Sequence, residues 1–202
     1  MHIPAQRMSV ADYLIVEKRT KLRYEYVDGE IYAMAGGSAR HNKLAMNLSG
    51  HAWQSRSSHG CQIYSQGMKL HVPTRNSYYY PDVMGSCESD DGADGHVICP
   101  CFVIEVLSDS TSGIDRREKR LAYLTLKSLD EYVIVDQYRM HVSVYRGAGG
   151  PWASQVLDTP DDVLKLTCVS VGIALKDIYE GVDFPKDEVR SEQYVSEYGT
   201  TA

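Results

Sequence analysis

One segment constrains the fold more than any other: the run CFVIEVL at residues 101–107, which is apolar except for Glu105. A nearly continuous apolar run is typical of a central strand that is covered on both faces of its sheet. A carboxylate inside such a strand is costly to bury unless it is paired or bound to a metal. The run therefore predicts a sheet with helices on both sides and singles out Glu105. The alternative is that Glu105 ends the strand and reaches solvent or an arginine.

The segments around this run predict one domain of the α/β (α+β) class over residues 1–184. We expect helices at residues 8–18, 38–57 and 114–126, and a hairpin that turns at Asp28-Gly29. Further strands are expected at residues 61–72, 78–84, 131–136 and 141–145. The strand–helix–strand unit from 101 to 136 should close as a right-handed parallel crossover. Residues 185–202 are polar and acidic, which predicts a flexible C-terminal tail.

A second carboxylate, Asp82, follows Pro81 on the preceding strand candidate and is itself followed by apolar residues. Two carboxylates on adjacent strands can converge, and hard divalent cations are held by one or two carboxylates with water and substrate phosphate. Lys119 lies on the helix that follows the Glu105 strand. A lysine there can orient a metal-bound water or stabilise charge on a phosphate. Alternatively, Lys119 belongs to a charged run, residues 116–120, that only solvates the helix.

These residues resemble a known motif. Pro81-Asp82, followed by Glu105 in an apolar strand, is similar to the Pro-Asp…(Asp/Glu)-x-Lys signature of the PD-(D/E)XK nuclease superfamily. A wider ordered set, spread over about residues 8–180, resembles the Uma-two family of proposed restriction endonucleases. The resembling positions are 28–38, 41, 47–48, 81–83, 103–108, 110–111, 115, 118–119 and 128–137.

The resemblance implies a restriction-endonuclease-like core, which is a mixed β-sheet flanked by helices. It also implies hydrolysis of phosphodiester bonds that depends on Mg²⁺ (or Mn²⁺). Asp82 and Glu105 would be metal ligands and, together with Lys119, the catalytic residues. By analogy Glu30 is a further metal ligand, or else a hairpin residue that faces solvent. His41 either orients a ligand or is an ordinary helix histidine with its hydrogen bonds satisfied.

Two positions depart from the family pattern. The superfamily lysine falls two residues after the glutamate, where this chain has Leu107. Lys119 would therefore have to bring its ammonium to the same space from the helix. The proline that usually follows Val-Leu-Ser in the family is Asp109 here, which loosens the loop and adds a negative charge near a phosphate-binding site.

The charge of the chain is unevenly distributed. The net charge of −6 argues against a simple polycationic nucleic-acid binder. However, residues 1–75 carry 10 basic and 5 acidic side chains, whereas residues 76–202 carry 11 and 22. We expect a bipolar surface, in which the helix from Arg40 and the helix of Lys119 flank the cleft. The acidic loop at 88–94 and the acidic tail should point away from it.

The remaining expectations concern partners and location. The partner should be nucleic acid, double-stranded DNA rather than RNA, bound by a homodimer because double-strand cleavage needs two sites. No stretch approaches 18 apolar residues, so we expect a cytoplasmic protein without a membrane span. The five cysteines match no zinc-binding spacing, which predicts reduced thiols. Two other functions stay open on this fold: a catalytically inactive nucleic-acid-binding or assembly module, and a small-molecule hydrolase.

Overall fold

The computed structural model describes residues 7–20, 22–34, 36–55, 60–107, 113–147 and 149–184, with only the backbone described at 113–116. The predicted tail at 185–202 and the loop around Asp109 lie outside these residues. The helices are α1 (Val10–Arg19), α2 (Ala39–Ser55), α3 (Gly113–Tyr123) and α4 (Leu175–Ile178). The first strands are β1 (Tyr24–Val27), β2 (Glu30–Ala33), β3 (Gln62–Ser65), β4 (Lys69–Val72), β5 (Ser77–Tyr79), β6 (Val83–Ser86) and β7 (His96–Val97). The later strands are β8 (Phe102–Val106), β9 (Glu131–Val135), β10 (Val142–Arg146), β11 (Ala153–Leu157), β12 (Val163–Leu166) and β13 (Val171–Ala174).

The predicted apolar run forms β8, an interior strand of a six-stranded mixed sheet. The strand order is β11-β10-β9-β8-β6-β3. β8 pairs with β9 in parallel, with α3 between them in the chain, and with β6 in antiparallel orientation. This confirms the mixed sheet, the central strand and the parallel pairing of β8 with β9.

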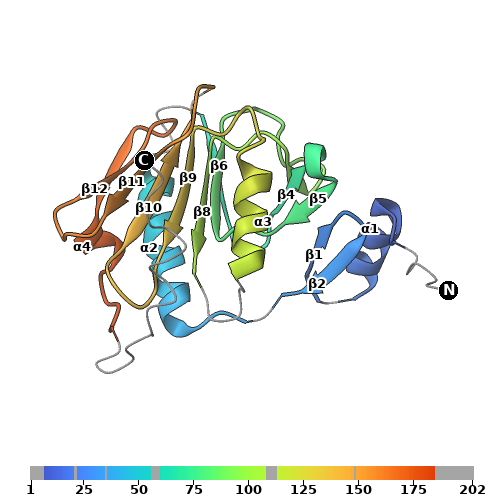
Figure 1. The fold of residues 1–202 in the computed structure, drawn as a ribbon, viewed down its shortest axis with the longest axis horizontal. Coiled ribbons are helices and arrows are strands. Elements are labelled where there is room, and N and C mark those ends of the chain that lie inside the picture. Colours follow the sequence, from blue (N-terminus) through green and yellow to red (C-terminus); the bar gives the residue numbers. More distant parts are fainter. Residues whose placement is uncertain are drawn as a thin grey trace.

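Helices α2 and α3 cover opposite faces of this sheet, and α3 lies in front of it in the view of Figure 1. Alternate side chains of a strand point to opposite faces. Ile104 and Val106 accordingly pack in one core cluster with Leu44 of α2, and Val103 packs in a second cluster with Tyr123 of α3. Glu105 shares the face of Val103, so its side chain is directed beneath α3.

Hydroxyl caps set the starts of α1 and α2. Ser9 accepts a hydrogen bond from the Asp12 N–H at 3.1 Å, and Ser38 accepts one from the His41 N–H at 3.1 Å. Such a cap satisfies one of the free N–H groups at a helix start. The cap at Ser38 places His41 in the first turn of α2.

Two expected strands each divide between two sheets, so the prediction of continuous strands at 61–72 and 78–84 was wrong. A second sheet has the order β2-β1-β5-β4-β7. The chain leaves the first sheet after β3 and re-enters it at β6. Gly67, with a φ of +131°, lies at the first break, and Pro81, which has no N–H for a ladder, lies at the second.

Four of the five cysteines meet in space, contrary to the prediction of reduced, unconnected thiols. The structure pairs Cys61 with Cys87 and Cys101 with Cys168. Sequence spacing could not indicate this arrangement, because the partners are 26 and 67 residues apart.

Across the described part of the chain, none of the helices combines the length and the apolar character that crossing a membrane requires.

Candidate active site

The two predicted carboxylates lie opposite each other on neighbouring strands. The pairing of β6 with β8 matches Val83 to Ile104 and Met84 to Val103, so one further step of the same register places Asp82 opposite Glu105. Directly opposed residues of an antiparallel pair share a face, with Cβ atoms about 5 Å apart. Asp82 is fixed against β8 because its Oδ2 accepts a hydrogen bond of 2.8 Å from the Val106 N–H.

Glu105 is a buried carboxyl with a strongly perturbed pKa. Its side chain is 13% exposed, and its Oε1 accepts a hydrogen bond of 2.8 Å from the Tyr123 hydroxyl. Burial raises the pKa of Glu105 to about 8; Lys119 opposes this shift, whereas the negative charge of Asp82 adds to it. Burial therefore favours a proton on this carboxyl in the absence of a further cation. A cation bound at this point would replace that proton.

Lys119 extends from α3 into the same buried region. Its Nζ lies 2.7 Å from Glu25 Oε1 and 3.9 Å from Glu105 Oε1, and the side chain is 10% exposed. Leu107, at the position of the superfamily lysine, is buried in the apolar cluster beneath α3. The positively charged side chain beside Glu105 is thus Lys119 of α3, and not a residue at the end of β8.

Glu25, which the sequence analysis did not single out, joins this cluster, whereas Glu30 does not. Glu25 is buried and, besides contacting Lys119, accepts a hydrogen bond from the Tyr80 N–H at 3.3 Å. Glu30 is exposed on β2 and accepts a hydrogen bond from the Tyr32 hydroxyl at 2.6 Å. Within the described part of the chain, Glu30 forms no hydrogen bond or ion pair with the cluster. A glutamate between two tyrosines carries no sequence signal that distinguishes it from a surface residue.

His41 holds Asp82 from the other side. Its Nε2 lies 3.1 Å from Asp82 Oδ2, and both side chains are largely buried. Burial disfavours protonation of His41, but the hydrogen bond to Asp82 and the charges of Asp82 and Glu105 outweigh it, so the pKa of His41 is raised. A Cβ at Gly37 would lie 2.9 Å from the His41 Nδ1, so glycine leaves room for this ring. The result is an ion pair that fixes the orientation of Asp82.

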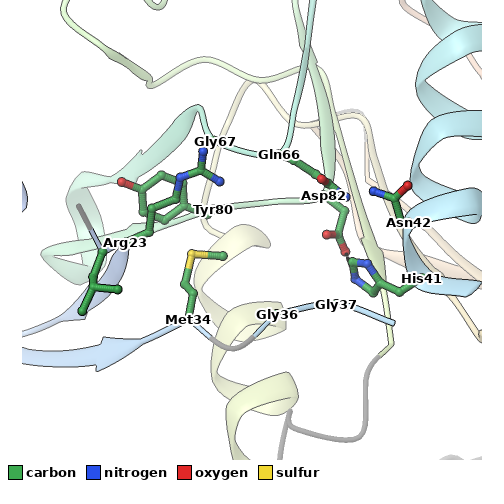
Figure 2. A pocket seen from close by; sticks show the side chains of 11 residues that line it. Arg23, Met34, Gly36, Gly37, His41, Asn42, Gln66, Gly67, Tyr80 and Asp82 are labelled. Carbon is green, nitrogen blue, oxygen red and sulfur yellow. Dashed lines mark ion pairs between the residues drawn. The ribbon is translucent and has the colours of Figure 1, made fainter. Parts of the chain in front are cut away.

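A pocket of about 380 Å³ opens beside this ion pair. Figure 2 shows Arg23 and Tyr80 on one side of it and Asp82 and His41 on the other. Gln66 and Tyr80, which line it, belong to the two segments where the chain passes between the sheets. The division of the two expected strands therefore creates the pocket wall.

The donor set suits a hard divalent cation. Asp82 and Glu105 offer carboxylate oxygens at the same end of β6 and β8, and Mg²⁺ is usually bound through one or two carboxylates while it keeps several waters. The raised pKa of Glu105 is the mark of a buried carboxyl whose charge is incompletely compensated. Asp82 and Glu105 therefore fit the metal that the resemblance implies.

The fold and this site define a nuclease-like α+β protein. Residues 10–176 match the Uma2 family model, which is described as "Putative restriction endonuclease". The chain belongs to this family, and its fold is consistent with the PD-(D/E)XK superfamily.

Two relatives and one solved structure are similar to this chain. The chain is 32% identical to the uncharacterized protein slr1290 of Synechocystis over 184 residues, which cover 90% of this chain and 96% of the relative. It is 34% identical to the uncharacterized protein sll1609 of the same organism over 145 residues, which cover 70% and 82%. A crystal structure of a "putative nuclease belonging to DUF820" from Anabaena variabilis matches with a TM-score of 0.71 and 17% identity, covering 86% of this chain and 98% of that one. At this identity the structural match shows the shared fold.

Proposed function

We propose that this protein is an endonuclease that hydrolyses phosphodiester bonds of DNA with Mg²⁺ (or Mn²⁺) held by Asp82 and Glu105. The observation that carries the proposal is the pair of carboxylates at one end of β6 and β8, Asp82 directly before β6 and Glu105 within β8, with the Lys119 ammonium 3.9 Å from Glu105 and an open pocket beside Asp82. The family description supports the nuclease class.

Each side chain has a distinct role in this proposal. The metal, when bound, polarises the scissile phosphate and lowers the pKa of a water. Glu105 would hold the metal together with Asp82, and the Tyr123 hydroxyl donates a hydrogen bond to Glu105 Oε1 that orients this carboxyl. Asp82 needs no reorientation, because Val106 and His41 already hold it. Lys119 positions the attacking water or offsets charge that develops on the phosphate.

The charges around the pocket support a polyanionic substrate. Arg23, His41 and Asp82 line the pocket. The raised pKa of His41 favours its charged form, which offsets the Asp82 carboxylate, and the Arg23 guanidinium adds a further positive charge. The acidic loop at 88–94 follows the end of β6, whereas Asp82 precedes its start. The acidic segment is thus separated from the pocket by the length of a strand. Our proposal includes double-stranded DNA as the substrate and a homodimer, since cleavage of both strands needs two sites.

The test is a cleavage assay on supercoiled plasmid, linear duplex, single-stranded DNA and RNA, with and without Mg²⁺. The proposal predicts cleavage that requires the metal and that falls by at least about 100-fold in Asp82→Asn and Glu105→Gln. Asp94→Asn, an exposed change in the acidic loop, is the matched control and should cleave as the wild type does. Wild-type activity in Asp82→Asn or Glu105→Gln would refute the assignment.

One observation favours a second function, a nucleic-acid-binding module without catalysis. Leu107 is buried at the position of the superfamily lysine, and Lys119 lies nearer to Glu25 than to Glu105. Such a module would bind nucleic acid with strong salt dependence and would show no metal-dependent turnover. The binding and cleavage assays on one protein preparation separate the two functions.

A further inference from the structure

A second cluster of potential metal ligands lies away from the candidate active site. The cysteine cluster comprises Cys61, Cys87, Cys101 and Cys168. The sulfurs of Cys87, Cys101 and Cys168 all lie within 4.8 Å of one another, and the sulfur of Cys61 is bonded to that of Cys87. Four sulfurs from distant parts of the chain therefore surround one small region.

The cysteine cluster sits at the opposite end of β6 and β8 from the two carboxylates. Cys87 follows the end of β6, whereas Asp82 precedes its start. Cys101 precedes β8, and Glu105 is near the end of that strand. Cys61 precedes β3, and continuing the β3–β6 register places it opposite Cys87. The two sites are thus separate.

We propose that the cysteine cluster, in its reduced form, binds one structural Zn²⁺ through four thiolates. The Cys87 and Cys101 sulfurs, which belong to different disulfides, are 3.6 Å apart. Four ligands at the usual Zn–S distance of ~2.3 Å stand ~3.8 Å apart in a tetrahedron. The contact between the two pairs therefore already has the spacing of a zinc site. Zinc requires that the two bonded pairs, once reduced, separate to that same spacing, and that the Cys61 sulfur moves toward the group formed by Cys87, Cys101 and Cys168.

The burial of the cysteines suits a structural ion with access from solvent. Cys61 and Cys101 are buried at the edge of the core, whereas Cys87 is exposed. An ion could enter past Cys87 and then be shielded from water on its inner side. Binding would release thiol protons but transfer no electrons, because zinc is taken up by the reduced chain.

The site would tie the C-terminal hairpin to the main sheet. Cys168 lies in the connection between β12 and β13, and the other three cysteines flank β3, β6 and β8. Leu164 and Ile173 of the hairpin belong to the same core cluster as Leu44 of α2. The hairpin forms its own two-stranded sheet, and Thr167 in its turn donates hydrogen bonds to Glu131 Oε1 of β9. A zinc ion would add a cross-link to the main sheet beside these hydrogen bonds.

The test measures zinc in the full chain purified under reducing conditions without a chelator. We expect about one zinc per chain by mass spectrometry, and a thermal midpoint that falls when the metal is removed. Metal-free, reduced protein should take up one Co²⁺ and show the absorption of tetrahedral thiolate ligation. Cys87→Ser, at an exposed position, should lower the zinc content at least tenfold. Cys99→Ser is the matched control, since Cys99 is a free cysteine outside the cysteine cluster, and should retain the zinc.

Two results would overturn the inference. One is a reduced wild-type protein with less than a tenth of a zinc per chain and no thiolate absorption with Co²⁺. The other is a freshly lysed protein that is denatured with a chelator, alkylated without a reductant, and found to react at only one cysteine, because this would show both disulfides already formed. Neither result depends on nuclease activity, so failure of this site and failure of the proposed function are distinguishable.

Discussion

The ammonium of Lys119 is the charge on which the buried carboxylates depend, and Lys119→Met tests that dependence. Glu25 and Glu105 have side chains only 10% and 13% exposed, and both lie within 4 Å of the Lys119 Nζ. Removal of one partner of a buried ion pair costs about 3–5 kcal/mol, because the remaining charge is uncompensated. Glu105 can avoid much of this cost by keeping its proton, since its pKa is already about 8. Glu25 carries the rest, and we expect a loss of about 3 kcal/mol.

Urea unfolding of the metal-free protein at pH 8, followed by circular dichroism, measures this loss. A thermal melt of the same protein is the second readout. For a chain of this size, 1 kcal/mol changes the thermal midpoint by about 2–4 °C, so this midpoint should decrease by about 6–12 °C. Glu25→Gln is the matched second change, because it removes the carboxylate whose ion pair with Lys119 is broken by Lys119→Met. In the double variant the loss should be clearly smaller than the sum of the two single losses. A loss under about 1 kcal/mol for Lys119→Met, or simple additivity with Glu25→Gln, would refute the reasoning.

Three other predictions concern the site and the core. Because Glu105 has a raised pKa in the folded, metal-free protein, the native state binds more protons than the unfolded state between about pH 4.5 and pH 8. The free energy of unfolding should therefore fall as the pH rises through this window. In Glu105→Gln the urea midpoint should vary less with pH. An unchanged dependence of the urea midpoint on pH would contradict a raised pKa at Glu105. His41→Ala removes the group that orients Asp82, so Mn²⁺ affinity in a calorimetric titration should weaken by about 10–100-fold; wild-type affinity would show that His41 does not position the ligand. Gly85→Ala would place a Cβ 2.3 Å from Phe102 Cε1 in the core, so unfolding should become easier by about 1–3 kcal/mol, and a stability equal to the wild type would mean that the ring moves freely.

The central strand and the positions of Asp82 and Glu105 were predictable because their signals are local. An apolar run predicts a buried strand wherever it occurs, and Pro81-Asp82 lies directly before the neighbouring strand β6. The choice between Glu25 and Glu30 was not predictable in this way. Both glutamates belong to one hairpin, but β1 pairs with β5 as well as with β2, so β1 is interior and β2 is an edge strand. Burial of Glu25 is therefore decided by a strand about 50 residues away.

The two divided strands and the cysteine cluster also depend on contacts between distant segments, which local sequence signals do not predict. Glycine and proline often mark an irregular position in a strand, but whether the strand bends or changes sheet at Gly67 and Pro81 depends on which partners it finds. Cys61, Cys87 and Cys101 come together because the antiparallel pairing of β3 with β6 and of β6 with β8 aligns the strand ends, and Cys168 joins them from the connection between β12 and β13. Sequence spacing records separation along the chain and carries no information on such alignment.

The most direct test of the shared metal site is anomalous diffraction from a crystal soaked in Mn²⁺. The account predicts a peak about 2 Å from a carboxylate oxygen of Asp82 and from one of Glu105, which disappears in a crystal of Glu105→Gln. A crystal saturated with Mn²⁺ that shows no peak between these two carboxylates would contradict it.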